Sequence, residues 1–137
     1  MSKKILVVDD NLDSRELVVK VLRAKGYQTI EAVDGEAAME KAIAERPDLI
    51  FMDRSLPKID GDEVTRRLKR LPGFEHIPIV ALTAHAMRGD RERALDAGCC
   101  GYLSKPIDIR RLPEQVASYL EGKQDADGEE DKDPDCR

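Results

Sequence analysis

The segment Asp48-Leu49-Ile50-Phe51-Met52-Asp53 places a carboxylate directly after a run of apolar residues. The next eight residues, 54–61, read Arg-Ser-Leu-Pro-Lys-Ile-Asp-Gly and contain proline, aspartate and glycine, which favour turns. A short apolar run bounded by turn signals is typical of a buried strand, which we predict over residues 48–52. Asp53 is therefore expected at the point where that strand ends.

Other apolar runs in the chain also end in polar residues. Asp9 and Asp10 follow residues 4–8, Thr83 follows residues 77–82, and Lys105 and Pro106 follow residues 101–104. Residues 27–32 form one more short run, whose alternation indicates an edge strand. Segments of helical periodicity separate these five runs, and this alternation is typical of α/β proteins with a parallel sheet.

The helical segments have recognisable ends. The predicted helices cover residues 13–25, the stretch between Asp34 and Pro47, a stretch carrying Val64, Leu68 and Leu71 up to Pro72, residues 87–97 and residues 109–121. Gly26 and Gly98 are expected to end helices, and Asp34 and Asp108 are expected to cap them. Because Pro113 falls near the first turn of the last helix, we expect an irregular start there.

The order of the elements predicts where the polar residues meet. Strands joined by helices lie parallel with right-handed crossovers, and the common five-stranded solution is the doubly wound order 2-1-3-4-5. Ligands bind such sheets at the carboxyl ends of the strands, near the switch point between strands 1 and 3. Asp9, Asp10 and Asp53 are expected to meet there, with Thr83 and Lys105 supplied by strands 4 and 5.

Length and charge bound the functional classes. The 137 residues fit a single domain, and the net charge of −5 resides in the segment from Glu121 onward, which has eight acids and three bases. Residues 1–120 carry 20 acids and 20 bases, so this part has no basic excess to attract nucleic acid or an anionic membrane. No apolar run is long enough to span a membrane, and we expect a cytoplasmic protein. The domain is predicted over residues 1–121, and the acidic tail over 122–137 is predicted to be disordered.

The polar residues at the sheet edge have a shared chemistry. Three carboxylates at one edge repel one another and favour a hard cation, Mg²⁺ or Mn²⁺, because all the ligands are oxygen. A carboxylate beside such an ion can act as a nucleophile toward a phosphoryl group. Lys105 can neutralise phosphoryl oxygens and Thr83 can donate a hydrogen bond to one. Each residue alone is more often a turn, cap or solvated residue, so it is their occurrence together at one edge of the sheet that indicates a site.

Several motifs resemble one protein family. They are Ile5-Leu6-Val7-Val8-Asp9-Asp10-Asn11, Pro47 to Asp53, Leu56-Pro57 with Asp60-Gly61, Leu82-Thr83-Ala84, and Gly101-Tyr102-Leu103-Ser104-Lys105-Pro106. In this order and spacing they resemble the receiver domains of bacterial two-component response regulators, and most closely the stand-alone receivers of the DivK and CheY kinds. The resemblance implies the flavodoxin-like (βα)5 fold and a switch whose chemistry is limited to its own phosphorylation and dephosphorylation.

The resemblance also implies individual roles. Asp53 would be the phosphoacceptor, and Mg²⁺ would be held by Asp9, Asp10, Asp53 and the backbone carbonyl of Ser55. Thr83 and Lys105 would contact the phosphoryl group, and Tyr102 would change its exposure as Thr83 moves. Pro106 is expected to follow a cis peptide bond.

The resemblance further implies the partners. The phosphoryl donor would be a phosphohistidine on a sensor histidine kinase or a histidine phosphotransfer protein. Phosphorylation would then change a surface formed by helix 4, strand 5 and helix 5, which binds a downstream protein. A monomer or weak dimer is expected, with no role in binding nucleic acid or membranes.

Some residues leave alternatives open. Arg54 is a bulky cation beside the acceptor that either tunes the site or is solvated, and we favour solvation. Ser55 and His85 occupy the two positions that influence the phosphoryl lifetime in this family, so the lifetime is not predicted. A phosphohydrolase using Asp53 as nucleophile is the alternative function, but Ser55 stands where such enzymes place a second aspartate. A flavin-binding module is discarded because the loop after the first strand is acidic.

Overall fold

The computed structural model describes residues 3–84 and 88–120, with the backbone alone for residues 88–91. The strands are β1 (Lys4–Val8), β2 (Gln28–Ala32), β3 (Leu49–Asp53), β4 (Ile79–Thr83) and β5 (Gly101–Ser104). The helices are α1 (Leu12–Ala24), α2 (Gly35–Glu45), α3 (Gly61–Lys69), α4 (Arg88–Ala97) and α5 (Leu112–Leu120). The predicted positions Met87, Glu121 and the tail 122–137, and also His85, lie outside the described residues.

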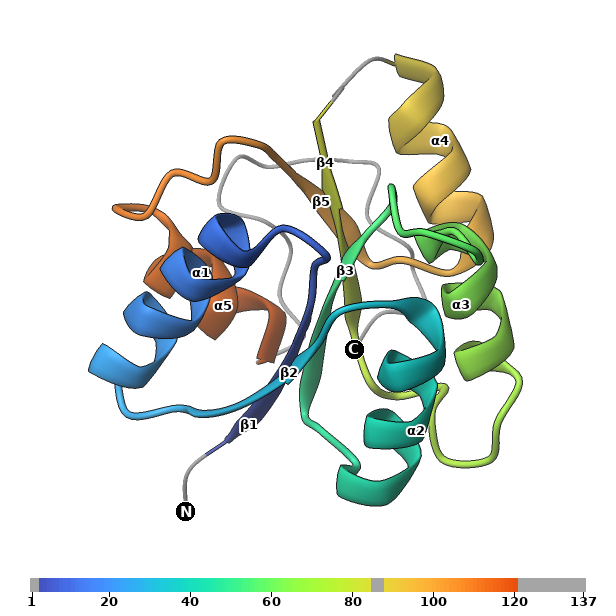
Figure 1. The fold of residues 1–137 in the computed structure, drawn as a ribbon, viewed down its shortest axis with the longest axis horizontal. Helices are drawn as coiled ribbons and strands as arrows, with labels where there is room; N and C mark the ends of the chain where they lie inside the picture. Colours follow the sequence, from blue (N-terminus) through green and yellow to red (C-terminus); the bar gives the residue numbers. More distant parts are fainter. Residues whose placement is uncertain (1–2, 85–87, 121–137) are drawn as a thin grey trace.

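The five strands form one parallel sheet in the order β2-β1-β3-β4-β5, as predicted (Figure 1). This is the CheY-like flavodoxin fold, with a helix between each pair of successive strands. Strand β1 pairs with both β2 and β3, so successive strands are added on one side of β1 and then on the other, while all strands stay parallel. The carboxyl ends of β1 and β3 therefore lie side by side at the switch point, where doubly wound sheets bind ligands.

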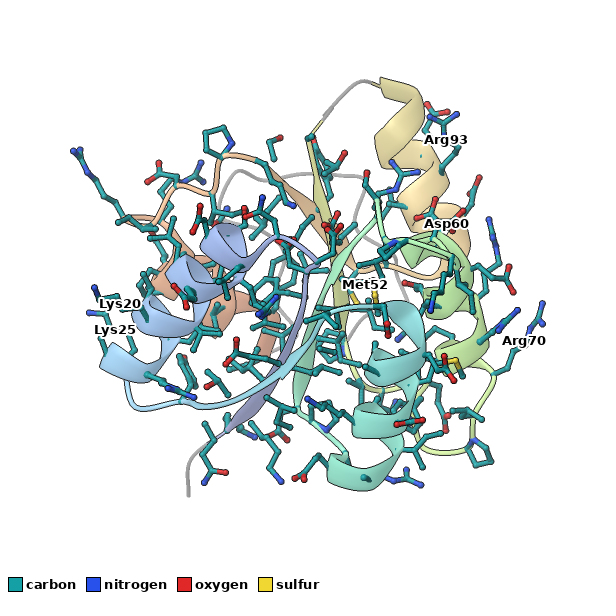
Figure 2. All side chains as sticks on the ribbon, viewed as in Figure 1. Lys20, Lys25, Met52, Asp60, Arg70 and Arg93 are labelled. Carbon is teal, nitrogen blue, oxygen red and sulfur yellow. The ribbon has the colours of Figure 1, made fainter. Side chains whose placement is uncertain are left out.

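Helices cover both faces of the sheet, with α1 and α5 on one face and α2, α3 and α4 on the other (Figure 1). Successive residues of β1 face opposite ways: Ile5 and Val7 pack with α1 and α5, whereas Leu6 and Val8 pack against the other three helices. Figure 2 labels Lys20, which is exposed on α1, Lys25, which is exposed at the end of that helix, and Met52, which is buried on the same face of the sheet as Leu6. Burial on both faces explains the continuous apolar runs of the inner strands.

Helix ends follow the expected residues at several positions. The side chain of Asp34 caps α2 by accepting a hydrogen bond from the amide of Ala37 at 2.8 Å. Gly26, just after α1, has a φ of +91°, a backbone conformation that glycine adopts without strain. Within residues 3–84 and 88–120, no helix combines the length and apolar character that crossing a membrane requires.

Several boundaries differ from the prediction by one or two residues; β4, for example, spans Ile79–Thr83 where 77–82 was predicted. Three further differences concern β3, α3 and α5. Strand β3 includes Asp53 itself, because the amide of Arg54 still donates to the carbonyl of Leu82 on β4 at 3.1 Å. Helix α3 ends at Lys69, before Leu71. Helix α5 begins at Leu112, because the carbonyl of Asp108 accepts hydrogen bonds from the amides of residues 111 and 112 in a preceding turn. Pro113 thus lies in the first turn of the helix, where its missing amide proton leaves no intrahelical bond unmade.

Candidate functional site

Asp9 lies where β1 passes into α1, and its side chain is almost completely buried, with 1% exposed. Its amide donates to the carbonyl of Ala32 on β2 at 3.1 Å, which continues the sheet by one residue. Its Oδ1 accepts a hydrogen bond from the amide of Asn11 at 2.9 Å. The next residue, Asp10, is exposed, so the two neighbouring carboxylates differ sharply in their access to solvent.

Asp53 ends β3 and is 3% exposed. Its Oδ1 accepts a hydrogen bond from the amide of Ser55 at 2.9 Å, so the start of the following loop is bonded to this carboxylate. Asp9, Asp10 and Asp53 each offer a carboxylate oxygen such that all three oxygens lie within 4.8 Å of one another. The prediction that these residues meet at the switch point agrees with this geometry.

Lys105 brings an ammonium group to the same place from the end of β5. Its Nζ lies 3.1 Å from Oδ2 of Asp9 and 3.1 Å from Oδ2 of Asp53, while its side chain is 20% exposed. Its amide donates to the carbonyl of Thr83 at 2.8 Å, which fixes the start of the loop beside the end of β4. One ammonium is therefore shared by two buried carboxylates.

The pKa shifts of Asp9 and Lys105 reflect this sharing. Burial raises the pKa of Asp9 above its ordinary value of 3.8; the amide of Asn11 and the ammonium of Lys105 oppose the rise, and the carboxylate of Asp53 adds to it. Burial by itself would lower the pKa of Lys105, but hydrogen bonds and charges from Asp9 and Asp53 outweigh it and raise the pKa. Lys105 thus remains charged. For Asp9, the contacts with Asn11 and Lys105 offset the effect of burial on the pKa only in part.

The donor set fits a hard divalent cation. The three clustered groups are carboxylates, which supply the oxygen ligands that Mg²⁺ prefers. Together they carry more negative charge than the ammonium of Lys105 neutralises. Because Asp10 is exposed, the cluster opens toward water, and Mg²⁺ characteristically retains several water ligands.

Comparisons with known proteins agree with the fold. The model of the response regulator receiver domain family matches residues 5–117. The chain is 44% identical over 120 residues to the polar-differentiation response regulator DivK of Brucella anthropi, covering 88% of this chain and 98% of DivK.

The chain belongs to the response regulator receiver domain family. Among solved structures it is similar to the receiver domain of the sensor histidine kinase PA1611 from Pseudomonas aeruginosa, which has a magnesium ion coordinated in its active site cleft. That similarity has a TM-score of 0.82 at 36% identity and covers 88% of this chain and 99% of the other. The chemotaxis response regulator CheY4 of Vibrio cholerae gives a TM-score of 0.82 at 28% identity, covering 85% and 98% of the two chains.

The remaining predicted residues of this receiver lie on β4, on β5 and in the segments that follow β3 and β5. Thr83 is the last residue of β4 and is 5% exposed, and the residue before it pairs with Asp53 across the sheet. Tyr102 lies half-buried on β5, and the peptide bond between Lys105 and Pro106 is cis. Ser55 is exposed, with its amide bonded to Asp53. Thr83, Ser55 and Pro106 thus lie at or just beyond the carboxyl ends of their strands, whereas Tyr102 lies within β5, where it pairs with Ala81.

The prediction that Arg54 is solvated is wrong. Its side chain is 13% exposed and forms two hydrogen bonds with Asp62, from Nε to Oδ1 at 2.9 Å and from Nη2 to Oδ2 at 2.7 Å. Asp62 lies in the first turn of α3, where an acidic residue is ordinary at a helix N-terminus and draws no special notice in a sequence. The pairing therefore depends on how α3 packs against the end of β3.

Arg15, which supports Asp9, was not among the predicted residues. Its Nη1 donates to the backbone carbonyl of Asp9 at 2.8 Å, and its Nε donates to Oε1 of Glu31 on β2 at 2.9 Å. Its side chain is 11% exposed. A cation in the first turn of a helix opposes the helix dipole, and this placement is the signal that could have indicated a specific partner.

Proposed function

We propose that this receiver is a phosphorylation switch in which Asp53 accepts a phosphoryl group from a phosphohistidine. Asp9, Asp10, Asp53 and the backbone carbonyl of Ser55 would hold Mg²⁺, and Mn²⁺ could replace it. The observation that supports the proposal most directly is the position of the Lys105 ammonium, 3.1 Å from carboxylate oxygens of both Asp9 and Asp53. A fixed positive charge beside a nucleophilic carboxylate suits the transfer of a phosphoryl group.

In the proposed step, a carboxylate oxygen of Asp53 bonds to phosphorus while the bond between phosphorus and the donor's imidazole nitrogen breaks. That nitrogen keeps the electron pair and takes up a proton. Lys105 neutralises phosphoryl oxygens, and the Thr83 hydroxyl donates a hydrogen bond to one of them. When bound, Mg²⁺ supplies positive charge that offsets the negative charge gathered on the phosphoryl group and carboxylates. Catalysis on this reading consists of positioning and charge stabilisation.

The output of the switch would be protein binding. We assign the phosphohistidine donor to a sensor histidine kinase or histidine phosphotransfer protein, and the response to a surface formed by α4, β5 and α5. Thr83 and Tyr102 would link the site to that surface, since they lie on the neighbouring strands β4 and β5. The switch would comprise residues 1–121 in a cytoplasmic protein that is a monomer or weak dimer.

Intact mass spectrometry tests the proposed chemistry. The wild type is incubated with Mg²⁺ and a small acyl phosphate donor, beside Asp53→Asn and a matched control, Asp48→Asn. Asp48 is exposed and adjoins the amino end of β3, so its substitution removes the same charge at the opposite edge of the sheet. We expect one added phosphoryl group on the wild type and the control, and none on Asp53→Asn or in excess chelator.

Two results would contradict this function. Phosphorylation of Asp53→Asn to the wild-type extent would place the acceptor elsewhere. Rapid multiple turnover of a generic phosphate ester would instead support the phosphohydrolase alternative, which the family match does not favour. Persistence of the modification on Asp53 for a measurable time distinguishes a switch from such an enzyme.

A further inference from the structure

The ion pair between Arg54 and Asp62 lies immediately beside the acceptor residue. Both side chains are 13% exposed, and the guanidinium bonds both carboxylate oxygens, at 2.9 and 2.7 Å. Two parallel hydrogen bonds fix the orientation of the groups as well as their separation. The pair therefore joins the end of β3 rigidly to the first turn of α3.

Backbone contacts hold the same junction. The amide of Gly61 donates to the carbonyl of Arg54 at 3.1 Å. A Cβ atom at Gly61 would lie 2.1 Å from the carbonyl oxygen of Asp53 and 2.8 Å from Cα of Arg54, so glycine is required for this approach. Residues 55–60 thus form a loop whose two ends are held together by a backbone hydrogen bond, by close contact and by the ion pair.

This loop carries a group of the proposed site. Ser55 follows Arg54 directly, and its amide donates to Oδ1 of Asp53 at 2.9 Å. Its carbonyl is the proposed backbone ligand of Mg²⁺, so a small rotation at the base of the loop moves that oxygen. Leu56 is buried and anchors the loop once more, whereas Pro57 and Lys58 are exposed.

We propose that Arg54 and Asp62 form a positioning pair that orients the Ser55 carbonyl and so sets the Mg²⁺ affinity of the site. This inference rests on the proposed function. Neither residue touches the phosphoryl group; both act through the backbone of residues 53–55. Supporting residues around metal sites commonly change metal affinity by 10-fold to 100-fold when they are substituted.

A purely electrostatic effect makes a different prediction. The positive charge of Arg54 repels a cation and that of Asp62 attracts it, so charge alone makes Arg54→Met bind Mg²⁺ more tightly and Asp62→Asn more weakly. Positioning makes both variants bind more weakly. It also makes the double variant no weaker than the worse single variant, because the pair is lost in each case.

Isothermal titration calorimetry with Mg²⁺ at fixed ionic strength separates these outcomes. We expect Arg54→Met and Asp62→Asn each to weaken Mg²⁺ binding by about tenfold, the low end of the effect of supporting residues. The matched controls are Arg67→Met and Glu63→Gln. These residues form an ion pair of 3.0 Å on α3 with side chains 46% and 38% exposed, and their substitution should leave the affinity unchanged.

A measurement without metal provides a second readout. Hydrogen exchange at the Ser55 amide, followed in excess chelator, should be faster in both single variants than in the controls, since its bond to Asp53 is less well held. Arg54→Lys keeps the charge without the two-pronged geometry and should lie between the wild type and Arg54→Met in both assays. If a single variant fails to fold, the double variant Arg54→Met with Asp62→Leu is measured in its place, because it leaves no unpaired buried charge.

The possible failures are distinguishable. Changes of Mg²⁺ affinity in opposite directions in the two single variants would overturn the positioning role. An unchanged Mg²⁺ affinity together with an unchanged exchange rate at the Ser55 amide would also overturn it. A folded double variant that binds Mg²⁺ as tightly as the wild type would do the same. A wild type that binds no Mg²⁺ would instead contradict the proposed function, and Ser55 exchange would then decide whether the pair holds the loop.

Discussion

The two edges of the sheet use charged side chains in different ways. At the amino edge, Lys4 pairs with Glu45 at 3.1 Å, and these side chains are 30% and 48% exposed. At the carboxyl edge, Lys105 is shared by Asp9 and Asp53, whose side chains are 1% and 4% exposed. At the amino edge one cation meets one anion and both are partly exposed to solvent. At the carboxyl edge one cation meets two buried anions, so a negative charge is left over. An ion pair that serves stability alone does not need surplus buried charge, whereas a site that binds a cation and a phosphoryl group does.

Loss of the shared ammonium should have the largest effect on chemistry. At saturating Mg²⁺ we expect Lys105→Met to slow phosphorylation by a small donor about 100-fold, the scale on which a preorganised charge-stabilising group acts. The Mg²⁺ affinity of the same variant should increase, because a competing positive charge is removed. Quantitative mass spectrometry gives the rate. Lys4→Met is the control, and a rate for Lys105→Met equal to that of the control would show that the ammonium has no part in transfer.

Mg²⁺ should stabilise the protein through the carboxyl edge. A ligand that binds the folded state alone adds about 2.7 kcal/mol to the free energy of unfolding at 100 times its dissociation constant. Urea unfolding across Mg²⁺ concentrations measures this gain, with sodium chloride at equal ionic strength as reference. Asp10→Asn should shift the dependence to higher Mg²⁺ concentration, whereas Asp13→Asn, an exposed acid on α1, should not. An equal gain from sodium chloride would indicate screening alone.

Much of this difference between the edges could be predicted from the sequence. Apolar runs and turn residues indicated five parallel strands, and parallel strands present their carboxyl ends at one edge, so Asp9, Asp53 and Lys105 were expected together. The partners of Arg15 and Arg54 were not predicted. Each lies on another element, and no periodicity reports which side chains meet across elements. The start of α5 was predicted too early because the side chain and carbonyl of Asp108 stabilise a turn before the helix.

The burial of Asp9 should cost stability when metal is absent. Its pKa is raised, first by burial, so the folded protein holds the proton more tightly than the unfolded chain. The associated stability is complete below the ordinary pKa of 3.8 and is lost as the pH rises through the raised pKa. In chelator near neutral pH, Asp9→Asn should therefore raise the free energy of unfolding by about 1 kcal/mol, as stabilising substitutions at functional sites do.

Urea unfolding of the wild type and Asp9→Asn at several pH values checks this expectation. The stability difference should shrink as the pH falls below 3.8, where the wild-type carboxylate is protonated in both states. Added Mg²⁺ should stabilise the wild type and have little effect on the variant. If Asp9→Asn instead destabilises the metal-free protein, the contacts of the carboxylate with Lys105 and Asn11 outweigh its burial.

The smallest effect is expected at the amino edge. Lys4→Met, Glu45→Gln and the double variant should each change the free energy of unfolding by about 0.5 kcal/mol or less, because exposed ion pairs gain little over their separate hydration. A double-mutant cycle by urea unfolding at low and high salt isolates the pair, and the coupling should vanish in high salt. Phosphorylation should be unchanged throughout. A coupling free energy well above this range that persists in high salt would contradict the expectation. It would show that the exposed pair stabilises the fold strongly, and the contrast between the two edges would be lost.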